Sequence, residues 1–224
     1  GRQIQQEMLR MMPWLEELYS DSPAETRFRA LQATVKETPL PRLWFMQYLD
    51  GLNLDLVKQR YRDETQLSQY FKQVYGIPGR MAGKVLGARE EDLRASLDAL
   101  ACGWGWAEVL RNLRPAIERG RIYIPQDILE SYGASEESLS RCEMTPELSR
   151  LIAASAGKAE SLLGQGEALL EALPADGSRE FARSFINEKR DSAASLLAQP
   201  EKVFLVKEDE GTARKLFNIS NWFR

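Results

Sequence analysis

Apolar residues recur at three- and four-residue spacing along almost the whole chain, which is the pattern of amphipathic helices. Together with proline and capping residues at the boundaries, this spacing predicts helices over residues 4–19, 28–38, 41–56, 63–74, 90–110, 125–133, 145–170 and 181–196. A last short helix is expected within 211–224. The convincing strand-like run is VFLV at 203–206, and it is too isolated to build a sheet. The chain is therefore predicted to be all-α.

Composition excludes several classes of function. The chain contains no histidine, so Ser-His and Cys-His nucleophiles, histidine bases and histidine metal ligands are all excluded. A net charge of −3 argues against a nucleic-acid partner, so any phosphate ligand is expected to bind locally. Cys102 and Cys142 lie far apart in the sequence, which predicts two separate buried thiols. No apolar run approaches about 18 residues, so the chain is not expected to span a membrane.

Glycines interrupt the helix predicted to begin at residue 63, in the segment QYFKQVYGIPGRMAGKVLG at 69–87. Each glycine inside a helix costs about 0.5–1 kcal/mol relative to alanine. The segment either breaks so that backbone can approach a ligand, or it packs closely against another helix. Neither GxxxxGK[ST] nor a preceding strand is present, so a nucleotide phosphate loop is not predicted.

A cationic segment follows the helix predicted over 90–110. Between residues 111 and 121 stand Arg111, Arg114, Arg119 and Arg121, against the single acid Glu118. This cluster predicts a site for a polyanion, because guanidinium groups hold phosphate oxygens in pairs. The alternative is a solvated helix end, where each cation gains about 0.3–1 kcal/mol from the carbonyl dipole.

Three segments, in this order, resemble the squalene/phytoene synthase family, the head-to-head prenyl transferases. They are LDGLNLDL at 49–56, the glycine-interrupted segment at 69–87, and LRNLRPAIERGRIYIPQDILESYG at 110–133, which is similar to the second aspartate-rich segment and the turn after it. The resemblance implies an isoprenoid-synthase-type bundle of antiparallel helices around a central cavity. It also implies a single domain over 1–224, expected to lack its N-terminal helices.

In that family, two aspartate-rich segments hold Mg²⁺ that bridges prenyl diphosphates. Asn112 and Ala116 stand at the positions of the second aspartate pair, and neither side chain can replace a carboxylate. Gly105 and Glu108 stand where amides are usual. The first aspartate-rich segment is expected before Gly1. The resemblance therefore implies a degenerate site without a bound metal cofactor.

The resemblance also suggests which residues line such a site. The phosphate-binding candidates are Arg111, Arg114, Arg119, Arg121 and Tyr123, and the candidates for lining the cavity are Tyr48, Gly76, Gly79, Trp104 and Ser155.

The loss of the aspartates, the segment MPWLEELYSDSP and the aromatic tail with Trp222 and Phe223 resemble a divergent, pseudoenzyme-like branch of the family. That branch includes the assembly factor of respiratory NADH:ubiquinone oxidoreductase, complex I. The leading hypothesis is a non-catalytic protein that binds a prenyl diphosphate or isoprenoid lipid, or that helps to assemble a membrane respiratory complex. Its expected location is the cytoplasm, peripheral to a membrane, or the mitochondrial matrix in a eukaryote.

Two alternatives stay open. In the first, the chain is an active Mg²⁺-dependent head-to-head prenyl transferase with a non-standard metal site that recruits Asp98, Glu118 or Asp127. In the second, it is a scaffold whose former cavity is filled by side chains, with a closed centre between the segments 89–111 and 145–172.

Overall fold

The computed structural model describes residues 11–22 and 24–205, and its contacts divide the chain into two compact units. The first unit comprises 1–57 with 208–224, and the second comprises 58–207. Helical turns cover residues 11–18, and the elements that follow are η1 (Thr26–Phe28), α2 (Arg29–Glu37), α3 (Arg42–Val57), α4 (Glu64–Phe71), η2 (Lys72–Gly76), α5 (Ile77–Val85), α6 (Glu90–Arg111), α7 (Leu113–Glu118), α8 (Gln126–Ser131), α9 (Glu136–Ser140), α10 (Pro146–Gly166), α11 (Ala168–Ala172), α12 (Gly177–Ala198) and η3 (Pro200–Phe204).

The prediction of an all-α chain is confirmed, and most predicted helix boundaries lie within a few residues of the observed ones. Thr145 is the N-cap of α10 as expected, because its hydroxyl accepts a hydrogen bond from the backbone N–H of Leu148 and Pro146 follows it. The expected strand-like run is wrong, since Val203 and Phe204 lie buried in the 3₁₀-helix η3. Residues 4–10 and the expected tail helix at 211–224 lie outside the described residues.

In the first unit, a buried glutamine organises the loop that leads into α2. The amide nitrogen of Gln32 donates to the carbonyls of Glu17 and Ser22, at 2.8 and 2.9 Å. Its side-chain oxygen accepts from the backbone N–H of Ala24 at 3.0 Å. A buried amide that satisfies three backbone groups compensates for its own loss of hydration. The loop is therefore stabilised by a polar side chain that the helical pattern did not single out.

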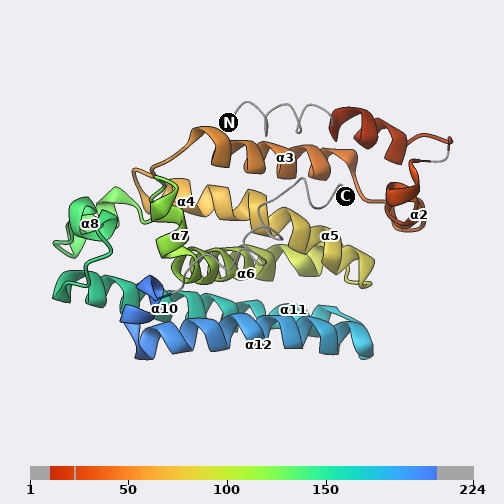
Figure 1. The fold of residues 1–224 in the computed structure, drawn as a ribbon. Coiled ribbons are helices and arrows are strands. Elements are labelled where there is room, and N and C mark those ends of the chain that lie inside the picture. The colour runs from red at the N-terminus through yellow and green to blue at the C-terminus, as the bar shows by residue number, and fades with distance from the viewer. Residues whose placement is uncertain (1–10, 23, 206–224) are drawn as a thin grey trace. The chain divides into compact units, whose positions relative to one another are not determined.

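Helix α6 is the central element of the second unit (Figure 1). The α4–η2–α5 segment packs on one side of it, and α10 and α12 pack on the other side and against each other. Gly103 allows α6 and α10 to approach closely, because a Cβ atom there would lie 2.8 Å from the backbone nitrogen of Leu163 and 3.0 Å from the carbonyl oxygen of Ala159. Gly166 repeats this contact from α10, since a Cβ atom there would lie 2.9 Å from Cβ of Leu100. Small residues therefore determine the distance between these two helices.

The glycine-interrupted segment remains helical. Helix α4 continues through η2, which is a π-helix, directly into α5. A Cβ at Gly76 would lie 3.3 Å from Cβ of Ala101, and one at Gly79 would lie 3.2 Å from Cδ2 of Leu97. Both neighbours belong to α6, so close helix packing is the interpretation that these contacts favour.

Candidate functional site

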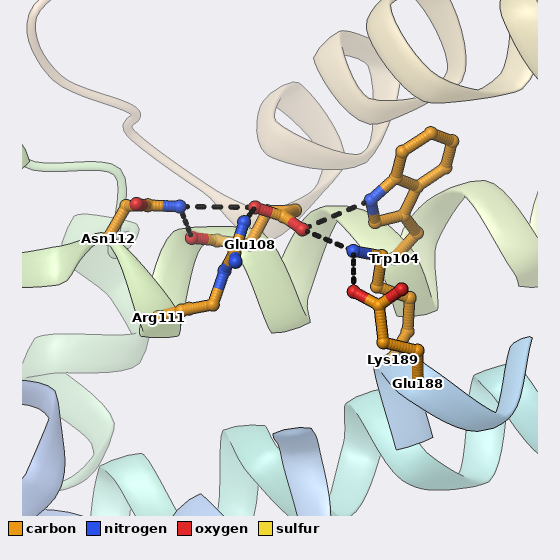
Figure 2. A network of polar contacts seen from close by, with 6 residues as sticks. All are labelled: Trp104, Glu108, Arg111, Asn112, Glu188 and Lys189. Carbon is orange, nitrogen blue, oxygen red and sulfur yellow. Dashed lines mark hydrogen bonds and ion pairs between the residues drawn. The ribbon is translucent and has the colours of Figure 1, made fainter. Parts of the chain in front are cut away.

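A buried glutamate near the end of α6 lies at the centre of a polar network (Figure 2). Glu108 is 7% exposed. One of its oxygens, Oε1, lies 3.1 Å from Nζ of Lys189 and 3.4 Å from Nε1 of Trp104. The other, Oε2, accepts from Arg111 at 2.5 Å and from Asn112 at 3.1 Å. We refer to Trp104, Glu108, Arg111, Asn112, Glu188 and Lys189 as the Glu108 network.

The helical repeat of α6 brings the first four of these residues together. Positions 104, 108, 111 and 112 follow the spacing that places side chains on one face of a helix. Asn112 is also the C-cap of α6, and its amide donates to the carbonyl oxygen of Glu108 at 2.9 Å. Asn112 therefore caps the end of α6 and holds the carboxylate one turn earlier.

Sequence reasoning missed Lys189, which contributes the network's second cation. Lys189 is 9% exposed, and its Nζ also lies 3.0 Å from Oε1 of Glu188. In α12 it lies on the buried stripe of Ile186, Ala193 and Leu196. Lysine is almost never fully buried unless it is paired. A lysine at an apolar position of the helical repeat was therefore the signal that could have identified it.

The network keeps Glu108 ionised at neutral pH. Burial raises the pKa of Glu108, but the charges and hydrogen bonds of Arg111 and Lys189 outweigh burial and hold the pKa below its usual value. Glu188 is 69% exposed, so water screens its charge. The network thus contains two cations, the buried Lys189 and the partly exposed Arg111, and two carboxylates, of which Glu108 is buried.

These residues do not fit the second half of a Mg²⁺ site. Mg²⁺ prefers several hard oxygen ligands, and both oxygens of Glu108 already face cationic or amide donors. Asn112 offers a neutral amide, and the methyl group of Ala116 lies in the core at 2% exposure. Within residues 11–22 and 24–205, no group of three or more carboxylate or thiol side chains is arranged to hold a metal ion.

The arginines of the predicted cluster have different partners. Arg111 belongs to the Glu108 network, whereas Arg114 pairs with Glu118 at 2.9 Å and donates to the carbonyl oxygen of Phe204. Arg119 is exposed, and Arg121 is half-buried in the turn after α7. The structure thus brings Arg111 together with Lys189 on the same carboxylate. The phosphate-binding assignment of the arginines stays a prediction.

Tyr123, the last phosphate-binding candidate, is part of an aromatic cluster. Its ring stacks on Tyr61 with centroids 5.9 Å apart and lies 5.8 Å from the ring of Tyr70. The segment that carries Tyr123 runs beside residues 59–62, where the backbone N–H of Ile122 donates to the carbonyl oxygen of Gln59. This arrangement gives Tyr123 a packing role in addition to the predicted one.

Aromatic rings fill the space around Trp104, a candidate for lining the cavity. Its ring lies 4.6 Å from Phe185 of α12 and 4.9 Å from Tyr75 of η2, measured between centroids. A Cβ at Gly105 would lie 2.3 Å from the ring of Phe71, so that ring packs directly on the backbone of α6. Aromatic side chains therefore pack closely around Trp104 and Gly105.

Two further cavity candidates lie elsewhere. Ser155 is 6% exposed within α10. Tyr48 belongs to the first unit, where burial and then the charge of Asp55 raise its pKa. Asp55 is itself only 7% exposed.

The acids that the metal-dependent alternative recruits have partners outside the Glu108 network. Asp98 pairs with Lys72 at 2.5 Å, and Asp127 accepts from the backbone N–H of Glu64 at 3.3 Å. Glu118 pairs with Arg114. Cys102 and Cys142 are two separate free thiols, as predicted, but they are half-buried rather than buried.

An exposed polar face of α12 adjoins the network. It carries Glu180, Arg183, Ser184, Asn187, Glu188 and Asp191. Glu188 belongs to both this face and the network. Among the described helices, none is long and apolar enough to cross a bilayer.

The known proteins whose sequences are similar to this chain belong to one family. The model of the family described as "Squalene/phytoene synthase" matches residues 2–214. A chloroplastic phytoene synthase of Narcissus pseudonarcissus is 34% identical over 137 residues, which cover 58% of this chain and 32% of that protein. A phytoene synthase of Thermus thermophilus is 29% identical over 152 residues, covering 68% of this chain and 52% of that protein. The chain thus spans about a third to a half of the length of these curated relatives.

Solved structures show the same fold. Squalene synthase HpnC from Alicyclobacillus acidocaldarius matches with a TM-score of 0.78 and 23% identity, covering 86% of this chain and 73% of the other. A dehydrosqualene synthase solved in complex with a ligand matches with a TM-score of 0.75 and 17% identity, covering 96% and 77%. The predicted isoprenoid-synthase-type helical fold is therefore confirmed.

Proposed function

The chain belongs to the squalene/phytoene synthase family, and we propose that it is a non-catalytic member that binds a prenyl diphosphate or a related phosphate-bearing isoprenoid lipid without a divalent metal. One observation carries this proposal. Glu108, which stands where the resemblance implies an amide, is engaged by Lys189 and Arg111, while Asn112 and Ala116 stand where carboxylates would be needed.

The missing ligands bear directly on catalysis. Mg²⁺ in such a site would neutralise charge as diphosphate departs, so losing its ligands removes transition-state stabilisation. Each loss of about 1.36 kcal/mol slows a reaction tenfold, and a whole ligand set contributes several times that amount. A chain with these residues is expected to bind a prenyl diphosphate without converting it to a product.

The retained groups support binding. Arg111 and Lys189 supply positive charge for a phosphate, and the rings of Tyr75, Trp104 and Phe185 lie next to them. Aromatic faces offer apolar area to an isoprenoid chain. The predicted link to assembly of a respiratory complex stays a prediction.

A second candidate function is an active Mg²⁺-dependent head-to-head prenyl transferase. The observation in its favour is that relatives with up to 35% identity are named phytoene synthases. It would need acids outside the Glu108 network, namely Asp98, Glu118 or Asp127, to hold the metal.

The full chain is expected to form no condensation product from geranylgeranyl diphosphate in the presence of Mg²⁺. It should bind that diphosphate with an affinity that EDTA changes by less than about twofold, because no step of binding uses the metal. Product analysis by chromatography and calorimetric titration with Mg²⁺ or EDTA measure the two outcomes. Condensation at ordinary enzyme rates, or binding that EDTA abolishes, would contradict the proposal and favour the transferase.

Restoring the two carboxylates is expected not to restore a metal site. Asn112→Asp with Ala116→Asp should leave Mg²⁺ affinity weak and lower stability, since position 116 is 2% exposed and an unpaired buried carboxylate is costly. Mg²⁺ titration and urea denaturation provide the readouts. Asn112→Asp alone separates the two positions, because it loses the amide donor to Glu108 but leaves the core around residue 116 intact. A strong gain in Mg²⁺ affinity by the double variant would reveal an intact site that lacks only ligands.

A further inference from the structure

A non-helical segment at the start of the second unit, residues 58–63, leads into α4. We call this segment the strap. It runs parallel to the segment that precedes α8, with a β-bridge between Arg60 and Ile122. Three of its carbonyl oxygens accept backbone hydrogen bonds from that segment and from the start of α8: Gln59 from Ile122 at 3.0 Å, Tyr61 from Gln126 at 3.0 Å, and Arg62 from Asp127 at 3.2 Å. The strap is therefore held along its length by residues 122–127.

The strap and α8 satisfy each other's backbone groups. Gln126 and Asp127 are the first two residues of α8, whose N-cap, Pro125, makes no side-chain cap. The first backbone N–H groups of a helix have no partner within the helix, and here carbonyl oxygens of the strap accept from two of them. In return, the Asp127 carboxylate accepts from the backbone N–H of Glu64, the first residue of α4, at 3.3 Å. Separation of the two segments therefore costs hydrogen bonds at the start of both helices.

One side chain fastens the strap to two further segments. The guanidinium group of Arg60 donates to the carbonyl oxygen of Gly120 at 2.8 Å, in the turn after α7. The same group lies 2.7 Å from Oε1 of Glu136, the first residue of α9. Arg62, two positions along the strap, pairs with its sequence neighbour Asp63 instead. Arg60 thus connects the strap to residues about 60 and 76 positions away in the chain.

The strap carries a buried ring on a fastening that is open to water. Tyr61 is 3% exposed, and its ring lies 5.7 Å from that of Tyr70 and 5.9 Å from that of Tyr123. The side chains of Arg60 and Glu136, by contrast, are 44% and 51% exposed. Segments held by water-exposed hydrogen bonds open more easily than a buried core, and they open as cooperative units. We propose that the strap and residues 120–127 are one such unit, fastened by Arg60, which opens to expose the Tyr61–Tyr123 stack while the rest of the second unit stays folded.

Hydrogen exchange in the full chain, followed by NMR, tests whether the two segments open together. The backbone amides of Glu64, Ile122, Gln126 and Asp127 should exchange at one common rate after correction for their intrinsic rates. That rate should exceed the rate of Leu151 and Ile152, which are fully buried in α10.

Arg60→Lys tests the fastening, because lysine keeps the charge but lacks the planar fork that contacts Gly120 and Glu136 together. It should accelerate exchange of all four amides about fivefold and leave the α10 amides unchanged. Arg62→Lys is the matched control, since it makes the same change in the strap at an exposed pair, and it should alter these rates less than about twofold.

Asp127→Ala tests the cooperativity. The Asp127 carboxylate contacts the start of α4, yet its loss should accelerate exchange of Ile122 and Gln126 as much as that of Glu64. Glu130→Ala, which removes a carboxylate of α8 that accepts from the Gln126 side chain, should have little effect on Glu64. Four unrelated exchange rates, or acceleration confined to Glu64 in Asp127→Ala, would overturn the proposal. None of these outcomes depends on whether the chain binds or converts a prenyl diphosphate.

Discussion

Replacing Lys189 with methionine is expected to destabilise the protein by about 3 kcal/mol, because the change leaves the buried Glu108 carboxylate with one cation, Arg111, instead of two. Glu108 is 7% exposed and Lys189 is 9% exposed, so water cannot take over the lost interaction. Urea denaturation followed by circular dichroism gives the free energy of unfolding. The double variant Glu108→Leu with Lys189→Met should recover most of the loss, since apolar side chains often replace a buried ion pair at little cost.

The same pair predicts how stability depends on pH. Because the pKa of Glu108 is lowered in the folded state, its contribution is fully present above about pH 4.5, the ordinary value, and is lost as pH falls through the folded-state pKa. Glu108→Gln should therefore show a smaller loss of stability in acid than the unmodified chain does. A Lys189→Met variant as stable as the parent, with the same acid profile, would mean that the pair does not contribute in solution.

Replacing Gly103 with alanine should lower stability by about 3 kcal/mol, because the new methyl group would meet backbone that cannot move independently. A Cβ atom at this position would lie 2.8 Å from the nitrogen of Leu163 and 3.0 Å from the carbonyl oxygen of Ala159. The two central helices must separate to accommodate it, and the aromatic packing around α6 would loosen with them. Thermal and chemical denaturation measure the change.

Gly164→Ala is the matched control for this effect. Gly164 lies inside α10, and nothing stands within 4 Å of a Cβ built there. Alanine at this position should stabilise the protein by about 0.4–1 kcal/mol, because it restricts the unfolded chain and favours the helix. Equal effects of the two alanines would show that helix propensity, rather than close approach, governs these glycines.

The helices were readable in the sequence because helix formation depends on residues three and four positions apart. Neighbouring residues in the sequence also identified Thr145 as an N-cap and carried the family resemblance in 110–133. The prediction from neighbouring residues was wrong at Val203 and Phe204, where β-branched and aromatic residues suggested a strand. Those side chains are buried in contacts with other helices, and such burial overrides local propensity.

The sequence identified only some of the residues of the candidate site. The absence of carboxylates at Asn112 and Ala116 is a property of the sequence alone, and so is the retention of Arg111. The sequence could not decide why Gly76 and Gly79 are glycines. A glycine allows close approach of either a ligand or another helix, and the sequence pattern is the same in both cases.

What the sequence determined by itself, then, is the all-α fold, the family and the absence of carboxylates at positions 112 and 116. Only the tertiary structure decided that Lys189 of α12 meets Glu108 of α6, because an ion pair between helices depends on which faces pack together and at what distance. The separation of α6 and α10 depends likewise on Gly103 and Gly166, through contacts between residues far apart in the chain. The Glu108–Lys189 pair is therefore a consequence of packing rather than of any local motif.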